Sequence, residues 1–263
     1  MKLVDEAEVP EHVFNSNAIE NSTLTLEETE KILNQVALDR YITEREIFEA
    51  RNLARVAGYI SGNASEKEMD IEMMLLLHKM LIANISTDIA GRFRQPGEYV
   101  RVGTHIAPAP ERIEEMITGM LYDYKAVYGT ATIIKQLSRF HLTFEHIHPF
   151  VDGNGRIGRV IINYLLVREG YVPVNIKFVD RQKYYEAFRE FDHDEKTDIM
   201  EEILYKALTN SYHKRLAYLE GREIINLAEY AKRMKLSHSN LLNKANRQTI
   251  EAFLEKGIWK IGI

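Results

Sequence analysis

The chain has 263 residues and a formal net charge of −5 at pH 7, and 45% of its residues are apolar. This composition supports a folded core, excludes an intrinsically disordered chain and gives no general attraction to nucleic acid or membrane. There is no cysteine, so disulfides are excluded and a structural zinc site is not expected. Because the sequence has neither a signal peptide nor a long uncharged apolar stretch, we expect a cytoplasmic protein that does not contact the membrane.

Two helix starts are predicted near the N-terminus. Asn17 followed three residues later by Glu20 is typical of an N-cap with a carboxylate partner, which predicts a short helix capped by Asn17. The segment Thr25-Leu26-Glu27-Glu28 has the pattern of a capping box, which predicts a helix as far as about residue 38. Apolar residues then recur at helical spacing along most of the chain, which predicts helices over residues 43–60, 69–82, 113–128, 133–147, 160–167, 184–191 and 200–219.

Residues 92–102 interrupt the helical pattern. Arg92–Gln95 and Glu98–Val102 lie on either side of Pro96-Gly97, which predicts two short strands around a turn. An isolated two-stranded hairpin is barely stable alone, so a functional role is more plausible here than an architectural one. The alternative is a plain surface turn.

The segment His-Pro-Phe-Val-Asp-Gly-Asn-Gly-Arg-Ile-Gly-Arg at residues 148–159 is rich in polar groups and glycine. Pro149 disfavours helical geometry at His148, so one helix is expected to end there and the next to begin after Gly155. A glycine loop before a helix N-terminus presents free backbone N–H groups to phosphate oxygens. Phe150 is expected to anchor this loop on the core.

The side chains of this loop suit the handling of phosphates and a metal. Asp152 offers a hard oxygen ligand for Mg²⁺, and Asn154 offers an amide N–H₂ to an oxyanion. Arg156 and Arg159 lie three residues apart, where two guanidinium groups can clamp phosphates. His148 titrates near neutral pH and could accept a proton. Each residue alone is more often structural, so the interpretation depends on their joint occurrence.

Histidines 141 and 146 are also close in sequence to His148. Spacings of five and two residues do not place three imidazoles on one helix face. We therefore interpret His141 and His146 as ordinary helix histidines rather than as metal ligands.

Residues 148–159 match the signature H-x-F-x-D/E-G-N-G-R-x-x-R, and the chain resembles the Fic family of nucleotide-transferring enzymes from Ser16 to about Leu208. The resemblance implies a mainly α fold, with a Fic-type helical core and one β-hairpin flap. It also implies a protein adenylyltransferase, which transfers AMP from Mg-ATP to a Ser, Thr or Tyr hydroxyl of a target protein or of itself. A related transfer, such as that of a phosphate, is the alternative within the family.

The resemblance implies site roles for individual residues. In the loop these are His148 as general base, Asp152 as Mg²⁺ ligand, Gly153, Asn154 and Gly155 as anion hole, and Arg156 and Arg159 as ligands of the β- and γ-phosphates. The residues implied beside the bound nucleotide are Val102, Gly103, Thr104, His105 and Tyr184. The target's backbone is expected to dock on the hairpin at 92–102 as an added strand.

The segment Ser16-Asn17-Ala18-Ile19-Glu20-Asn21 fits the family's inhibitory motif S/T-x-x-x-E-G/N. The resemblance implies that Ser16 and Glu20 belong to a self-inhibiting element. Glu20 would pair with Arg159 and withdraw that guanidinium from the γ-phosphate. Removal of AMP, with Glu20 positioning a water molecule, is a second activity that this motif leaves open.

The last residues differ in charge, because residues 222–263 carry eight Lys and Arg against four Asp and Glu. Apolar residues at 227–231 and 240–242 around a short turn predict a helix-turn-helix-like module, with or without a wing at 257–261. Such a module binds DNA in many proteins, so a DNA-binding regulator with a vestigial core is a rival function, and a packing or homo-oligomer appendage is the plainer one. The predicted domains are residues 1–68, with the inhibitory helix, 69–219, the catalytic core, and 220–263.

Overall fold

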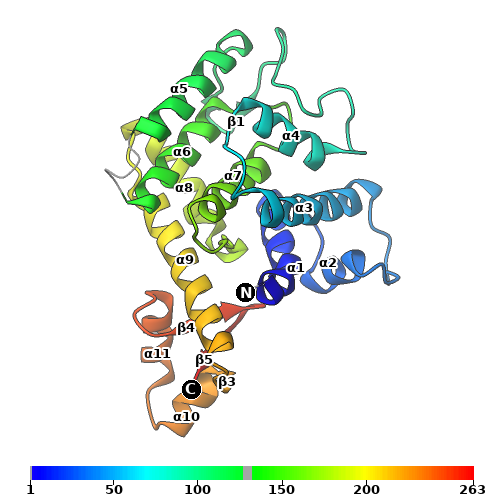
Figure 1. The fold of residues 1–263 in the computed structure, drawn as a ribbon. Helices are drawn as coiled ribbons and strands as arrows, with labels where there is room; N and C mark the ends of the chain where they lie inside the picture. The colour runs from blue at the N-terminus through cyan, green and yellow to red at the C-terminus, as the bar shows by residue number, and fades with distance from the viewer. Residues whose placement is uncertain (1, 127–131) are drawn as a thin grey trace.

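A computed structural model of the chain describes residues 2–126 and 132–263, with side chains from Val4 onward. The main body is built of helices (Figure 1). They are α1 (Lys2–Ile19), α2 (Leu26–Leu33), α3 (Glu44–Asn63), α4 (Ile71–Ile82), α5 (Ile113–Ala126), α6 (Ile133–Ile147), α7 (Asn154–Arg168), α8 (Arg181–Asp194) and α9 (Asp198–Leu219). Two short 3₁₀ turns are Pro110–Arg112 and Phe178–Asp180. The fold is therefore mainly α, as predicted.

Most predicted helices lie within a few residues of their observed bounds, and side-chain caps explain several of the starts. Thr25 accepts from the backbone of Glu28 and Glu28 bonds back to Thr25, so the predicted capping box is present. Helix α2 nevertheless ends at Leu33 rather than near residue 38, because Gln35 has a positive φ of 57° that breaks the helix. The last residues of the helix predicted over 113–128 lie outside the described residues.

Helix α7 is the centre of the body, with α3, α4 and α6 packed around it (Figure 1). It is buried on nearly all sides, from Asn154 to Leu166, which is unusual for a helix of a soluble protein and marks it as a core element. One hydrophobic core contains residues on both sides of the predicted boundary at 68, such as Leu53 of α3 and Leu77 of α4. The loop that precedes α7 is therefore fixed by the most rigid part of the fold.

The hairpin does not lie where the sequence predicted it. The two strands are β1 (Arg101–Val102) and β2 (His105–Ile106), and the turn is at Gly103, whose φ is +59°. The strand predicted over residues 92–95 is wrong because side chains, rather than a β-ladder, hold this segment. Arg92 forms a bidentate ion pair with Glu98 across the Pro96-Gly97 turn.

The N-terminal helix is longer than predicted. Asn17 is not an N-cap, because α1 runs unbroken from Lys2 to Ile19 and residues 16–20 form its C-terminal end. The backbone carbonyl of Asn17 accepts from the N–H of Glu20 and so closes the last turn. The other end of α1 is held by Arg215 of α9, whose Nη2 atom lies 2.6 Å from both Asp5 Oδ1 and Glu8 Oε2. This pairing between distant parts of the chain could not be read from local pattern.

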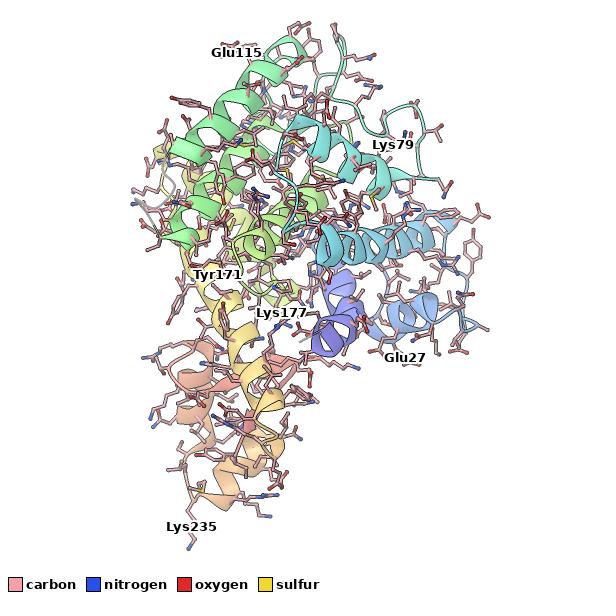
Figure 2. All side chains as sticks on the ribbon, viewed as in Figure 1. Glu27, Lys79, Glu115, Tyr171, Lys177 and Lys235 are labelled. Atoms are coloured by element: carbon pink, nitrogen blue, oxygen red, sulfur yellow. The ribbon has the colours of Figure 1, made fainter. Side chains whose placement is uncertain are left out.

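The C-terminal residues form a small unit at the end of α9 (Figure 1). Its elements are β3 (Ile224–Asn226), α10 (Leu227–Arg233), α11 (His238–Asn246), β4 (Ala252–Glu255) and β5 (Ile258–Gly262). The strands form an antiparallel sheet in the order β3-β5-β4, and α10 and α11 are joined by a short turn. The unit has its own small hydrophobic cluster, and Lys235 lies at its tip, far from the main body (Figure 2).

Candidate functional site

The loop between α6 and α7 carries the residues predicted to act on phosphates. Helix α6 ends at His148, whose φ is +49° and whose N–H bonds to the carbonyl of Phe144. Phe150 is fully buried, and its ring stacks on His78 of α4 with centroids 3.7 Å apart, so it is the anchor that was predicted. Gly153 has a φ of +86°, which only glycine adopts readily, and it turns the chain into α7.

The side chain of Asn154 is bonded to the backbone of its own loop. Its amide Nδ2 donates to the carbonyl of Phe150 and its Oδ1 accepts from the N–H of the same residue, at 2.8 and 2.9 Å. These bonds satisfy the buried loop backbone, and a contact of this side chain with an anion stays a prediction. The first α-helical bond of α7 runs from the N–H of Ile157 to the carbonyl of Gly153. The backbone N–H groups before Ile157 therefore have no acceptor within the helix, and the anion hole at this helix N-terminus stays a prediction.

His148 is largely buried at the end of α6. Burial lowers the pKa of His148 to about 4, although a hydrogen bond with the backbone of Glu145 opposes the shift. The imidazole is therefore neutral at physiological pH and can accept a proton. Sequence reasoning missed Arg94, whose buried guanidinium donates to the carbonyls of His148, Ile147, Glu98 and Pro108. Nothing in the local sequence indicates this role, because all four acceptors are backbone atoms.

Asp152 and Arg156 belong to a network of ion pairs at the start of α7. The carboxylate of Asp152 contacts Arg45 of α3 and lies 3.2 Å from Arg156, which also pairs with Glu49 at 2.9 Å. Burial raises the pKa of Asp152, but Arg156 and Arg45 outweigh it and leave the pKa below its usual range. An ionised carboxylate that is one-third exposed and already attracts cations fits a Mg²⁺ ion, which commonly uses one protein carboxylate plus substrate phosphates.

Arg159 is held by the end of α1. Its Nη2 lies 2.9 Å from Glu20 Oε1 and 2.8 Å from the carbonyl of Ser16, and its Nε donates to Ser16 Oγ at 2.9 Å. The guanidinium is buried, and the Glu20 carboxylate lies so close to Gly155 that a Cβ there would be 2.2 Å from Glu20 Oε1. The structure thus brings together Ser16, Glu20 and Arg159, which the sequence predicted to interact across 139 residues.

Tyr184 is buried beside Arg159. Its side chain is 1% exposed, and its hydroxyl lies 2.7 Å from Nε2 of His141 and 3.2 Å from Nη1 of Arg159. The ring is covered by the core and by Phe188, and the contact with adenine stays a prediction. The hydroxyl of Tyr184 accepts a hydrogen bond from Arg159. The helical spacing of the tyrosine in the sequence does not predict this contact.

A buried carboxyl that sequence reasoning did not single out lies beside this cluster. Burial raises the pKa of Glu145 to about 8, and the charge of Glu20 adds to the shift. Glu145 is therefore mostly protonated at neutral pH, so it does not compete with Glu20 for Arg159. The Oε1 atom of Glu145 has no hydrogen-bond partner among the described protein atoms.

The remaining predicted residues lie in the β1–β2 hairpin. Val102, Gly103 and Thr104 are exposed at its tip, and His105 is half-buried. The ring of His105 bonds through Nε2 to the backbone carbonyl of His146, two residues before His148. The base of the hairpin therefore lies against the C-terminal end of α6, close to the loop.

Residues 68–166 match the model of the Fic/DOC family. The protein adenylyltransferase Fic of Nematostella vectensis is 30% identical over 187 residues, which cover 70% of this chain and 43% of that protein. The protein of the same name from Drosophila melanogaster is 34% identical over 179 residues, which cover 66% of this chain and 36% of that protein. The chain therefore spans less than half the length of these relatives.

Solved structures show the same fold. Fic-1 from C. elegans has a TM-score of 0.71 at 22% identity and covers 82% of this chain and 64% of its own. A Fic family protein from Desulfovibrio desulfuricans has a TM-score of 0.67 at 22% identity and covers 98% of this chain and 87% of its own. The helical body of this chain thus has the mainly α fold of these solved structures. The chain carries a domain of the Fic/DOC family.

Proposed function

We propose that the chain is a protein adenylyltransferase that transfers AMP from ATP to a hydroxyl group of a Ser, Thr or Tyr residue. The observation that carries this proposal is the meeting of a neutral His148, the N-terminus of α7 and the carboxylate of Asp152 in one loop. The printed name of the curated relatives, protein adenylyltransferase Fic, points to the same reaction. Within the described residues no helix is long and apolar enough to cross a membrane.

In the proposed reaction the target hydroxyl attacks the α-phosphorus of ATP. The hydroxyl proton passes to the imidazole of His148, a bond forms between the hydroxyl oxygen and the α-phosphorus, and the bond to the bridging oxygen breaks to release pyrophosphate. Backbone N–H groups of Gly153, Asn154 and Gly155 would stabilise the developing negative charge. A Mg²⁺ ion on Asp152 would neutralise phosphate charge, and Arg159 would align the γ-phosphate once it is free.

We further propose that the chain is self-inhibited through the contact between Glu20 and Arg159. The three bonds from Arg159 to Ser16 and Glu20 occupy both its Nε and its Nη2 atoms. A planar guanidinium whose Nε and Nη2 atoms are already hydrogen-bonded cannot make a bidentate contact with a phosphate. The proposed relief of inhibition is a movement of the end of α1 away from α7.

The target protein would dock on the β1–β2 hairpin rather than on the whole of residues 92–102. The side chains of Val102 and Ile106 are 40% and 73% exposed. A short hairpin with free backbone groups and exposed apolar side chains suits the addition of an extended target strand.

The reaction class is tested with a Glu20→Ala variant incubated with Mg-ATP labelled on either the α- or the γ-phosphate. AMP transfer to the protein itself retains the α label and loses the γ label. Retention of the γ label would identify phosphate transfer instead. Adding His148→Ala should reduce the transfer rate by about 10²–10⁴-fold while ATP still binds. Near-full transfer by that double variant would remove His148 from the role of general base.

A further inference from the structure

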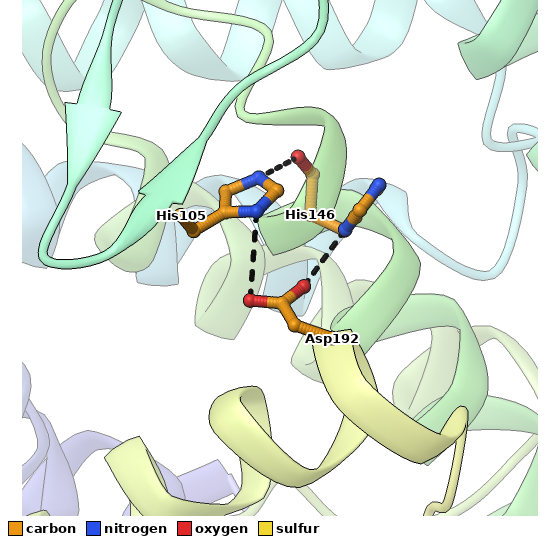
Figure 3. A group of neighbouring side chains, drawn as sticks. All are labelled: His105, His146 and Asp192. Atoms are coloured by element: carbon orange, nitrogen blue, oxygen red, sulfur yellow. Dashed lines mark hydrogen bonds and ion pairs between the residues drawn. The ribbon is translucent and has the colours of Figure 1, made fainter.

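A cluster of potential metal ligands lies outside the loop between α6 and α7. His105 of β2, His146 of α6 and Asp192 of α8 converge on one point, although they come from three separate elements (Figure 3). One ligand atom from each residue lies within 4.8 Å of the others. The interpretation of His146 as an ordinary helix histidine is therefore incomplete, because its neighbours come from β2 and α8 rather than from its own helix.

The distances in the cluster suit a metal ion. Asp192 Oδ1 lies 2.8 Å from Nδ1 of His146, and Asp192 Oδ2 lies 3.6 Å from Nδ1 of His105. Tetrahedral coordination with bonds of about 2.0–2.1 Å places ligand atoms about 3.3 Å apart. The two observed separations lie on either side of this value but end on different oxygens of Asp192, so rotation of the side chains is needed to place both imidazoles and the carboxylate around one ion.

The hydrogen bond of His105 fixes which of its nitrogens is free. Nε2 lies 2.8 Å from the carbonyl oxygen of His146, which can only accept, so Nε2 carries the hydrogen. In the neutral ring Nδ1 then presents its lone pair to the carboxylate of Asp192. A cation bound between the Nδ1 lone pair and the carboxylate would therefore be attracted by both. An imidazole that donates its other N–H to a backbone carbonyl is also the usual arrangement of metal-binding histidines.

We propose that His105 Nδ1, His146 Nδ1 and the carboxylate of Asp192 bind a divalent transition-metal ion of the Zn²⁺ class, with a fourth position open to solvent. Two imidazoles and one carboxylate suit Zn²⁺, Ni²⁺ or Cu²⁺, whereas Mg²⁺ prefers oxygen ligands throughout. This site is therefore distinct from the one at Asp152. A bound ion would join the hairpin to α6, two residues from His148, and to α8.

The test is a calorimetric titration of the tag-free full chain with Zn²⁺ in the presence of excess Mg²⁺. We expect one equivalent of Zn²⁺ to bind, and we expect His146→Ala and Asp192→Asn each to weaken it by at least about 100-fold, since loss of a ligand costs more than loss of an outer-shell partner. The matched control is His193→Ala. His193 is an exposed histidine on the same helix as Asp192 that already contacts Asp194 at 2.6 Å, and its substitution should leave binding unchanged.

Two outcomes would overturn the proposal. The first is a wild-type chain that binds no Zn²⁺, and the second is one-equivalent binding that survives both ligand substitutions. Melting curves recorded without metal establish that the variants are folded. Co²⁺ provides an independent readout, because its visible absorption should appear with the wild type and the control and should be lost in Asp192→Asn.

Discussion

The imidazole of His148 illustrates how the fold prepares a single residue for its proposed role. Burial takes the ring out of water and lowers its pKa to about 4, and the charge of Arg94 contributes in the same direction. The positive φ at His148 is held by the hydrogen bond from its N–H to the Phe144 carbonyl and by the hydrogen bond from Arg94 to its own carbonyl. Sequence reasoning predicted the residue but not its neutral state, which depends on burial by distant elements.

This state predicts the pH dependence of transfer. A general base acts when it is deprotonated, so the rate is present above its pKa and is lost as the pH falls through that value. With Glu20→Ala at saturating Mg-ATP, the self-modification rate should stay level between pH 8 and pH 6 and fall only near pH 4. Loss of the Glu20 charge lowers the pKa of His148 further, so it does not alter this expectation. A half-maximal rate near pH 6.5 would show an ordinary, solvated imidazole.

For individual residues, the sequence predicted which side chains belong to the site better than it predicted the contacts that they make. The pairing of Glu20 with Arg159 and the anchoring by Phe150 are as predicted. Asn154 and Tyr184 have protein partners that were not predicted, because both satisfy buried polar groups of the protein itself, and their contacts with a ligand stay predictions. A motif specifies which side chains are present, but the partners of a buried polar atom depend on packing.

The packing of α6 against α7 depends on one glycine. An added Cβ at Gly158 would lie 2.5 Å from Glu145 Oε1 and 2.6 Å from Cε1 of His141, both of which are buried. The two helices can therefore approach closely only because residue 158 has no side chain. Gly158 lies within the motif, but glycine is needed at this position for the close packing of two helices rather than for the geometry of the loop.

We predict that Gly158→Ala destabilises the protein by about 1–3 kcal/mol, because over-packing forces the helices apart. Urea unfolding measures this change. Gly58→Ala on α3 is the matched control, since a Cβ there meets nothing within 4 Å, and it should be neutral or slightly stabilising. Equal stability of Gly158→Ala and wild type would mean that α6 and α7 are not in the contact described here.

The helices were predicted well because apolar spacing and caps are local signals, as at Thr25 and Thr43. The predicted position of the hairpin was wrong because residues 92–98 are held by hydrogen bonds to segments that are distant in the sequence. Arg94 contacts carbonyls that follow it by up to 54 residues, and these contacts replace the ladder predicted for residues 92–102. A turn signal such as Pro96-Gly97 therefore located a turn, but not the strands.

Across the whole molecule, the C-terminal unit is attached to α9 and also contacts the N-terminal helices. Lys214 of α9 pairs with Glu255 at 2.6 Å and with Glu8 at 3.3 Å, and Lys256 pairs with Glu30 of α2 at 2.7 Å. DNA binding by this unit stays a prediction. Four of its basic residues already form ion pairs with carboxylates, which lessens the free positive charge: Arg222, Arg233, Lys256 and Lys260.

We predict that truncation after Gly221 lowers the melting temperature but leaves self-modification by the Glu20→Ala variant intact. The truncation exposes the face of α9 around Ala217, which packs on Gly262. The loop between α6 and α7 should stay in place, because its Phe150 belongs to the core of the main body and not to the small C-terminal cluster. Lys256→Ala is the control, because it breaks the contact with α2 and keeps the unit. A truncated chain that folds but no longer binds ATP would show that the C-terminal unit belongs to the site.

The contact proposed to be inhibitory joins the end of α1 to the central helix α7, since Glu20 follows α1 and Arg159 lies in α7. A second ion pair on the same helix joins Glu11 to Lys177 at 2.6 Å, and Lys177 lies beside α1 (Figure 2). Both pairs hold α1, but only the first occupies a guanidinium of the motif. Glu11→Ala is thus a matched control that loosens α1 without freeing Arg159.

The decisive measurement is the initial rate of α-labelled AMP incorporation by wild type, Glu20→Ala, Glu11→Ala and Glu20→Ala/Arg159→Ala. We predict a near-background rate for wild type and for Glu11→Ala, and an increase of at least about 100-fold for Glu20→Ala, which is the range expected when one charged donor becomes available to the transition state. The double variant should return to background. No activation by Glu20→Ala, equal activation by Glu11→Ala, or full activity of the double variant would contradict the proposed control of Arg159 by Glu20.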